Sequence, residues 1–188
     1  AMIEPKKRKK ITWEVLIKKT MDAPLLPVDD IHSILVAISK SVHHQIHPVR
    51  VAPLVFQLMH KAILCPHTEF RTKAGIFGLI PRIGIDWTSH LDAHMRSECL
   101  SFFKAQFELQ CQFIAAETTH QSIGYLCDAA VYLGIESPEF AQVVAENFAD
   151  NHCSLPPLAL VQYANYLSLQ SGTVSRQVWR QIATEALR

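Results

Sequence analysis

The chain of 188 residues lacks most features by which catalytic and membrane proteins are recognised. No apolar run approaches the roughly 18–20 residues of a membrane span, because the longest, residues 75–85, is interrupted by Pro81 and Arg82. The six glycines form no phosphate-binding loop, and neither a G-x-S-x-G nor a paired-carboxylate motif is present. We therefore predict a protein that is not an enzyme, with no catalytic residue, no cofactor and no membrane span.

Metal-binding motifs are also missing, since the chain has neither C-x-x-C nor H-E-x-x-H. His90 and His94 lie four residues apart with Cys99 after them, and a second set of possible ligands comprises His43, His44, His47, Cys65 and His67. Ten histidines give such close pairs by chance, so we predict no metal site. The five cysteines are odd in number and widely spaced, which favours reduced thiols over a disulfide framework.

Lysine and arginine are absent from residues 105–175, which carry seven acidic residues, whereas residues 40–104 carry eight basic residues against four acidic ones. We expect a bipolar molecule, whose first half attracts a polyanion and whose second half repels it. The first half supplies a candidate RNA-binding patch: Arg50, Lys61, Arg71, Lys73 and Arg82. The second half supplies a candidate surface for a basic partner protein: Glu117, Asp128, Glu136, Glu139, Glu146 and Asp150.

Residues 1–10 form a basic leader without apolar periodicity, which we expect to be flexible. Its basic run resembles a monopartite nuclear import signal and consists of Lys6, Lys7, Arg8, Lys9 and Lys10. The same side chains could instead contact nucleic-acid phosphates, or belong to a solvated tail. Residues 1–2 look like an expression scar, and residues 11–188 are predicted to form a single helical-repeat domain.

Apolar residues recur at helical spacing along the chain, and no segment shows the alternation typical of a strand. The pattern predicts an all-α fold of about eight or nine helices. A loop is predicted at residues 43–48, and Pro81 is expected to kink or end the helix over residues 69–83. Expected helices cover residues 13–21, 29–38, 51–64, 69–83, 91–103, 122–133, 138–150, 157–169 and 176–188. Residues 107–116 either continue the helix over residues 91–103 or form a separate helix.

The last third of the chain contains an internal repeat, because residues 122–150 can be laid over residues 160–188 at a constant offset. Tyr125 then matches Tyr163, and each copy reads as helix, glycine stop, serine cap and helix, with Gly134 and Ser137 in the first copy. This pattern predicts antiparallel helix pairs stacked as a short right-handed α-solenoid. Four tyrosines of the repeats could stack on bases, although packing in the core is favoured: Tyr125, Tyr132, Tyr163 and Tyr166.

The repeat also carries a resemblance to known families. Residues 125–140, YLCDAAVYLGIESPEF, and the leucine-rich start at residues 155–161 resemble the octotricopeptide, heptatricopeptide and FAST-kinase-like repeats of organellar gene expression. HEAT-like arrays share the same helix-pair arrangement. The resemblance covers about residues 70–188 and implies an RNA-binding helical repeat, often in mitochondria.

Three functions follow as hypotheses. The first is a non-catalytic helical-repeat adaptor that binds other proteins within a multiprotein assembly, such as one that processes RNA. The second is direct RNA binding by the basic first half, and the third is a homodimeric structural module. We expect an intracellular protein, in the mitochondrial matrix or alternatively in the nucleus.

Overall fold

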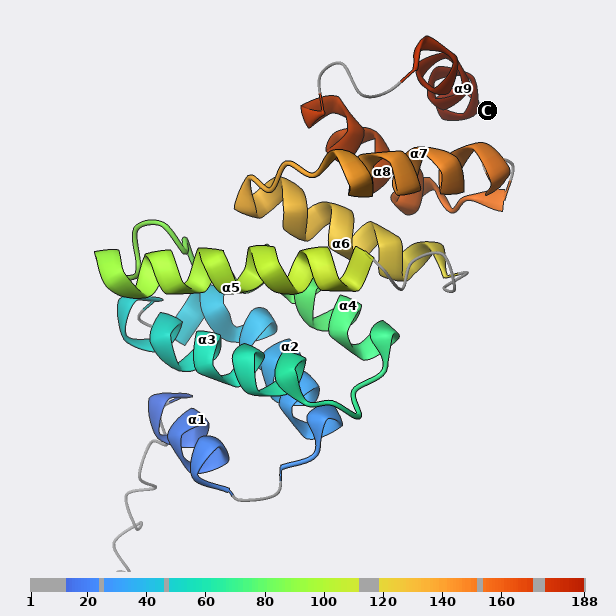
Figure 1. Ribbon diagram of the computed structural model, residues 1–188. Helices are drawn as coiled ribbons and strands as arrows, with labels where there is room; N and C mark the ends of the chain where they lie inside the picture. The colour runs from blue at the N-terminus through green and yellow to red at the C-terminus, as the bar shows by residue number, and fades with distance from the viewer. Residues whose placement is uncertain are drawn as a thin grey trace, which may run out of the picture.

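The computed structural model describes residues 13–23, 26–45, 48–111, 119–151, 154–170 and 175–187. These residues form nine α-helices and no strand, so the predicted all-α class is confirmed (Figure 1). The helices are α1 (Trp13–Asp22), α2 (Val28–Gln45), α3 (Pro48–Leu64), α4 (Phe70–Leu79), α5 (Ala93–Cys111), α6 (His120–Leu133), α7 (Pro138–Asn151), α8 (Pro157–Leu169) and α9 (Arg176–Ala186).

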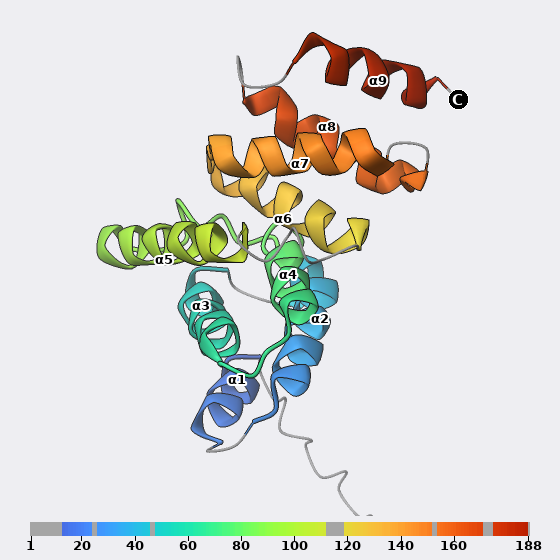
Figure 2. The same cartoon turned by 45° about the vertical axis from the view of Figure 1, so that its right-hand side comes forward.

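The helices are stacked in two rows that run from α1 at one end of the molecule to α9 at the other (Figures 1 and 2). In one row α2 packs on α4, α4 on α6 and α6 on α8. In the other row α3 contacts α5, α5 contacts α7 and α7 contacts α9. This order is the one expected of stacked helix pairs, while the right-handed solenoid and the repeat family stay predictions.

Glycine and serine mark the ends of the repeat helices as predicted. Gly134 adopts a left-handed conformation with φ of 63°, and the N–H of Ile135 donates to the carbonyl of Ala130 at 2.9 Å. This arrangement is a Schellman-type end, which satisfies carbonyls that the last helical turn leaves free. Gly84 repeats the conformation with φ of 68°, and Ser137 then caps α7 by accepting the N–H of Phe140 at 3.3 Å. Gly172 lies outside the described residues.

Two predicted boundaries were wrong, and one open alternative is decided. The loop at residues 43–48 is helical up to Gln45, and α3 begins at Pro48, because proline is tolerated in a first turn whose N–H groups have no helical partner. The helix predicted from residue 91 begins at Ala93, since Asp92 caps it by accepting the N–H of Met95 at 2.9 Å. Of the two alternatives for residues 107–116, the described residues show the continuation, because α5 runs unbroken as far as Cys111.

A chain of aromatic rings connects the two halves of the stack. Phe77 of α4 lies with its centroid 6.3 Å from that of Phe107 in α5, and Phe107 lies 4.7 Å from Phe140 in α7. Phe140 in turn lies 4.8 Å from Tyr166 of α8. All four rings are fully buried, and edge-to-face pairs at such distances add to the stability that burial provides. The core is therefore continuous from the basic half into the acidic half.

Candidate functional site

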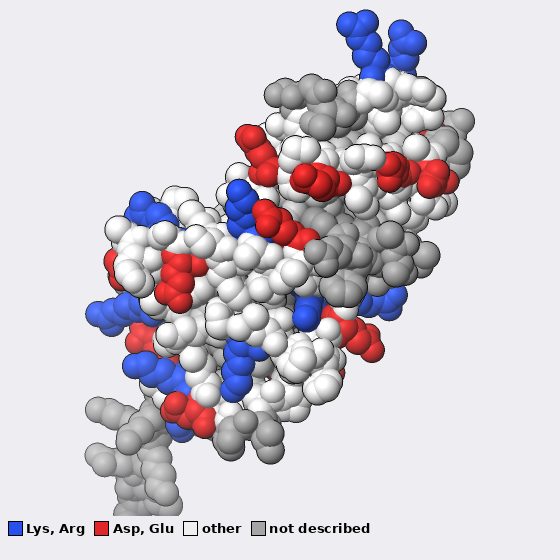
Figure 3. Space-filling model, in the orientation of Figure 1, with Lys and Arg blue, Asp and Glu red and all other residues white. Residues whose placement is uncertain are grey.

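The acidic residues predicted as a partner surface gather on α7 and on the turn before it. Glu139, Glu146 and Asp150 are exposed and recur with Gln142 at spacings of three and four, so they share one face of the helix. Glu136 is also exposed, in the turn that leads into this face. A row of acidic side chains is visible over α7 in Figure 3. We call Glu136, Glu139, Glu146 and Asp150 the α7 acidic stripe.

The other two predicted acidic residues do not belong to this stripe. Asp128 of α6 is half-buried and accepts a hydrogen bond from the side-chain amide of Gln162 in α8 at 2.5 Å. Its carboxylate therefore links α6 to α8. The sequence pattern places Asp128 in an acidic stretch but does not predict this contact. Glu117 lies outside the described residues.

The predicted basic patch is only partly assembled. Arg71 and Arg82 line one groove, whereas Arg50, Lys61 and Lys73 do not. Lys61 is used inside the fold, where its ammonium group donates to the carbonyl of Ala23 at 3.3 Å and so holds the end of α1 against α3. The basic run formed by Lys6, Lys7, Arg8, Lys9 and Lys10 lies outside the described residues.

The groove of Arg71 and Arg82 has a volume of about 350 Å³ and runs over α4, between α2 and the start of α6. We call it the α4 groove. Arg71 and Gly75 line it from α4, and Arg82 lines it from the turn after this helix. Gly78 lies three positions after Gly75 in α4. The two glycines let the neighbouring helices approach α4 closely.

Each glycine lies under a ring from a neighbouring helix. A Cβ atom placed on Gly75 would lie 3.3 Å from Nε2 of His32 in α2. One placed on Gly78 would lie 2.6 Å from the ring of Tyr125 in α6, closer than real Cβ contacts. His32 and Tyr125 therefore form walls of the α4 groove only because the floor between them lacks side chains.

Tyr125 is also fixed by polar contacts. The guanidinium carbon of Arg82 lies 5.0 Å from the centroid of the Tyr125 ring, which is a cation–π contact. The Tyr125 hydroxyl accepts a hydrogen bond from the side-chain amide of Gln121 at 2.6 Å. The arginine and the ring are thereby held together at one end of the α4 groove.

The four repeat tyrosines fall into three environments. Tyr163 and Tyr166 are fully buried, which confirms the core interpretation for both, and burial raises the pKa of Tyr163 above its usual value. Tyr132 is exposed, with its hydroxyl donating to the carbonyl of Ile85 at 2.8 Å. Tyr125 is thus the repeat tyrosine that lines the α4 groove.

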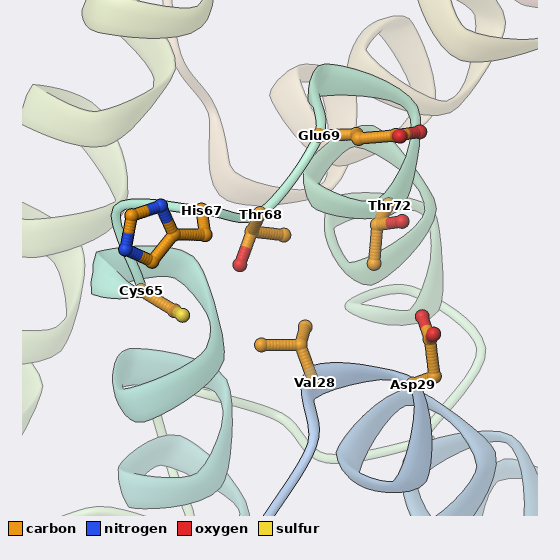
Figure 4. Close-up of a pocket in the computed structure, with 7 residues that line it drawn as sticks. All are labelled: Val28, Asp29, Cys65, His67, Thr68, Glu69 and Thr72. Carbon is orange, nitrogen blue, oxygen red and sulfur yellow. The ribbon is translucent and has the colours of Figure 1, made fainter.

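A second hollow, of about 410 Å³, adjoins the α4 groove, because Asp29 and Thr72 line both. Figure 4 shows the thiol of Cys65 and the hydroxyl of Thr68 pointing into this hollow, with Val28 facing them. The hydroxyl of Thr68 and the backbone of His67 hydrogen-bond the sulfur and lower the pKa of Cys65. The sequence pattern predicts a reduced thiol or a metal ligand at Cys65, but it does not reveal that this partly exposed thiol has a lowered pKa.

The histidine and cysteine sets do not converge in the described structure. Among the described residues, no group of three or more His, Cys, Asp or Glu side chains could hold a metal ion. His90 instead accepts the N–H of Asp86 through Nδ1 at 3.0 Å, and Cys99 is buried, which raises the pKa of its thiol to about 12. The side chains of His43, His44 and His47 lie outside the described part of the chain.

Two further findings concern membrane spans and related proteins. None of the described helices is both long and apolar enough to span a bilayer. No protein-family model, curated protein or solved structure matches the chain. The resemblance to organellar repeat proteins therefore stays a prediction from the sequence.

Proposed function

We propose that this protein is a non-catalytic helical adaptor, whose α7 acidic stripe binds a basic segment of a partner protein within a larger assembly. The supporting observation is that the stripe presents its carboxylates on one exposed face, within a stretch of sequence that has no lysine or arginine. A surface of a single sign attracts an oppositely charged partner and repels nucleic acid. Such a surface suits the adaptor better than direct RNA binding.

The positions of the acidic residues on α7 suggest that they do more than stabilise the helix. Carboxylates stabilise a helix near its N-terminus but destabilise it near its C-terminus, where the helix dipole is negative. Glu139 lies in the first turn of α7, whereas Asp150 lies in the last turn, which holds no basic residue. Since Asp150 opposes the stability of its own helix, a binding role explains its presence better than a structural one.

The adjacent helix α8 offers apolar contacts to the same partner. Its sequence contains no charged residue, and 62% of Leu158 and 54% of Val161 are exposed, with Leu169 exposed further along. Exposed apolar side chains near a charged surface are typical of protein interfaces. α8 packs against α7, so these exposed apolar side chains and the stripe belong to neighbouring helices.

The resemblance to organellar repeat proteins also suggests which assembly the adaptor belongs to. We place the adaptor in an RNA-processing assembly of the mitochondrial matrix, as the resemblance implies. The import-like run Lys6–Lys10 gives the nucleus as the alternative compartment. Imaging the tagged full-length chain in its own cells separates the two.

Affinity capture of the tagged full-length protein, with and without nuclease, tests the adaptor. We expect partner proteins that survive nuclease and are lost from the triple variant Glu139→Gln, Glu146→Gln, Asp150→Asn. The matched control is Glu69→Gln, Glu98→Gln, Glu108→Gln, which removes three exposed carboxylates elsewhere and should retain the partners. Loss of every partner on nuclease treatment, or equal losses in both variants, would reject the proposal.

A further inference from the structure

We propose that the α4 groove binds a nucleotide, with Arg71 and Arg82 holding phosphate and the rings of His32 and Tyr125 beside the base. The site is formed by α2, α4, α6 and the turn after α4, whereas the adaptor surface is on α7 and α8. This inference therefore goes beyond the adaptor function and does not depend on it.

The cations of the groove are available to an anion. Arg71 and Arg82 are both exposed, and neither forms an ion pair with a carboxylate of the described residues. Arg71 lies in the first turn of α4 and Arg82 in the turn after it, and both line the groove, so one extended ligand can reach both side chains. The first turn of α6 also lines the groove and adds the positive end of a 14-residue helix.

The rings make a nucleotide a better ligand than an acidic peptide. Aromatic side chains and guanidinium planes both stack on nucleobases. In the α4 groove, Arg82 already lies over the Tyr125 ring at 5.0 Å, and His32 lies over Gly75 on the other side of α4. A peptide carboxylate would use the arginines but would gain little from the two rings.

Asp29 distinguishes a nucleotide from a simple polyanion. Its carboxylate is the only acidic group that lines the groove among the described residues, and it would repel a chain of bare phosphates. A ribose hydroxyl or a base amino group can instead donate a hydrogen bond to it. The mixture of two arginines with one carboxylate therefore suits a ligand that carries both phosphate and polar donors.

The size of the groove sets the size of the ligand. About 350 Å³ lies at the lower end of the range for small-molecule sites, which is roughly 300–1,000 Å³. The groove therefore accommodates about one nucleotide unit. That unit is either a free nucleotide or part of a single strand that continues beyond the groove.

Calorimetric titration of the full chain with AMP, UMP, tripolyphosphate and hexauridylate tests the proposal. We expect AMP or UMP to bind more tightly than the base-free tripolyphosphate. Because a charged hydrogen bond to phosphate is strong, Arg71→Gln and Arg82→Gln should each weaken binding by about tenfold or more. The matched control Arg50→Gln, at an exposed arginine outside the groove, should leave the affinity unchanged.

The two nucleotide sources give different results. Equal affinities for UMP and hexauridylate indicate a free nucleotide, whereas tighter binding of hexauridylate with the same arginine dependence indicates a single strand. Tripolyphosphate binding as tightly as the nucleotides would overturn the proposal. So would an absence of nucleotide binding at millimolar concentration, or equal effects of Arg50→Gln and the groove variants. Circular dichroism of each variant checks that the exposed substitutions leave the fold intact.

Discussion

At the scale of single residues, Gly78 has no room for even a methyl group. Alanine there would place its Cβ 2.6 Å from the Tyr125 ring, and we expect Gly78→Ala to lower the free energy of unfolding by about 1–3 kcal/mol. In the matched variant Gly75→Ala, the new Cβ lies 3.3 Å from Nε2 of His32, which is a looser contact, so the loss should be smaller. Urea denaturation followed by circular dichroism measures both, and equal losses would contradict the close packing of Tyr125 on α4.

Cys65 gives a pH-dependent prediction at the same scale. Because hydrogen bonds from Thr68 and His67 lower the pKa of Cys65, its reactive thiolate should be populated at lower pH than that of an ordinary thiol. The rate of iodoacetamide labelling should rise with pH and reach its plateau earlier than for Thr68→Val, which lacks the hydroxyl. Peptide mapping by mass spectrometry resolves the site, with buried Cys99 as an unlabelled internal reference. Identical profiles for the two proteins would contradict the assigned cause.

At the scale of elements, α7 carries the proposed binding surface together with a carboxylate that opposes the helix dipole. We expect Asp150→Asn to raise the free energy of unfolding by about 0.3–1 kcal/mol, because it removes a negative charge from the C-terminal end of the helix dipole. The matched variant Glu139→Gln removes a charge from the first turn and should lower stability by a similar amount. Thermal denaturation at low salt measures both changes. A loss of stability in Asp150→Asn would show that this carboxylate has a structural role.

The helix ends show which elements were predictable from the sequence. Gly134, Ser137 and Ser175 were assigned correctly because backbone conformation and capping depend on a few neighbouring residues. Ser89 is also a residue type that caps helices and lies just before α5, but its hydroxyl donates to the Asp86 carboxylate at 2.6 Å and belongs to the preceding turn. Local sequence therefore predicts that a cap exists, but competing acceptors decide which residue forms it.

At the scale of the whole molecule, the repeat predicts helix positions but not environments. Tyr125 and Tyr163 occupy the same place in the two copies, yet Tyr125 lines a groove and Tyr163 is fully buried. The difference comes from the residues that surround each ring in the folded protein. The ring of Tyr125 packs on Gly78 of α4, whereas the hydroxyl of Tyr163 donates to Asn147 of α7 at 3.2 Å.

The sequence alone predicts the α7 acidic stripe but not the α4 groove. Most of the α7 acidic stripe is local in the sequence, so charge counting could find it. The α4 groove combines three helices and the turn after α4, and no sequence motif links His32, Arg71 and Tyr125. Its formation depends on the tertiary packing of α2 and α6 against the glycine positions of α4.

The oligomeric state separates an adaptor from a homodimeric module. A stable homodimer buries about 800 Å² of each partner, mostly around an apolar centre. The exposed apolar residues of α8 are few and alternate with exposed Asn165 and Ser168, so we expect a monomer of 21.2 kDa in the absence of partner. Leu158→Gln with Val161→Gln should keep this mass but reduce nuclease-resistant partner capture. Sedimentation at increasing concentration measures the mass, and a wild-type mass that doubles while the variant stays monomeric would assign α8 to self-association instead.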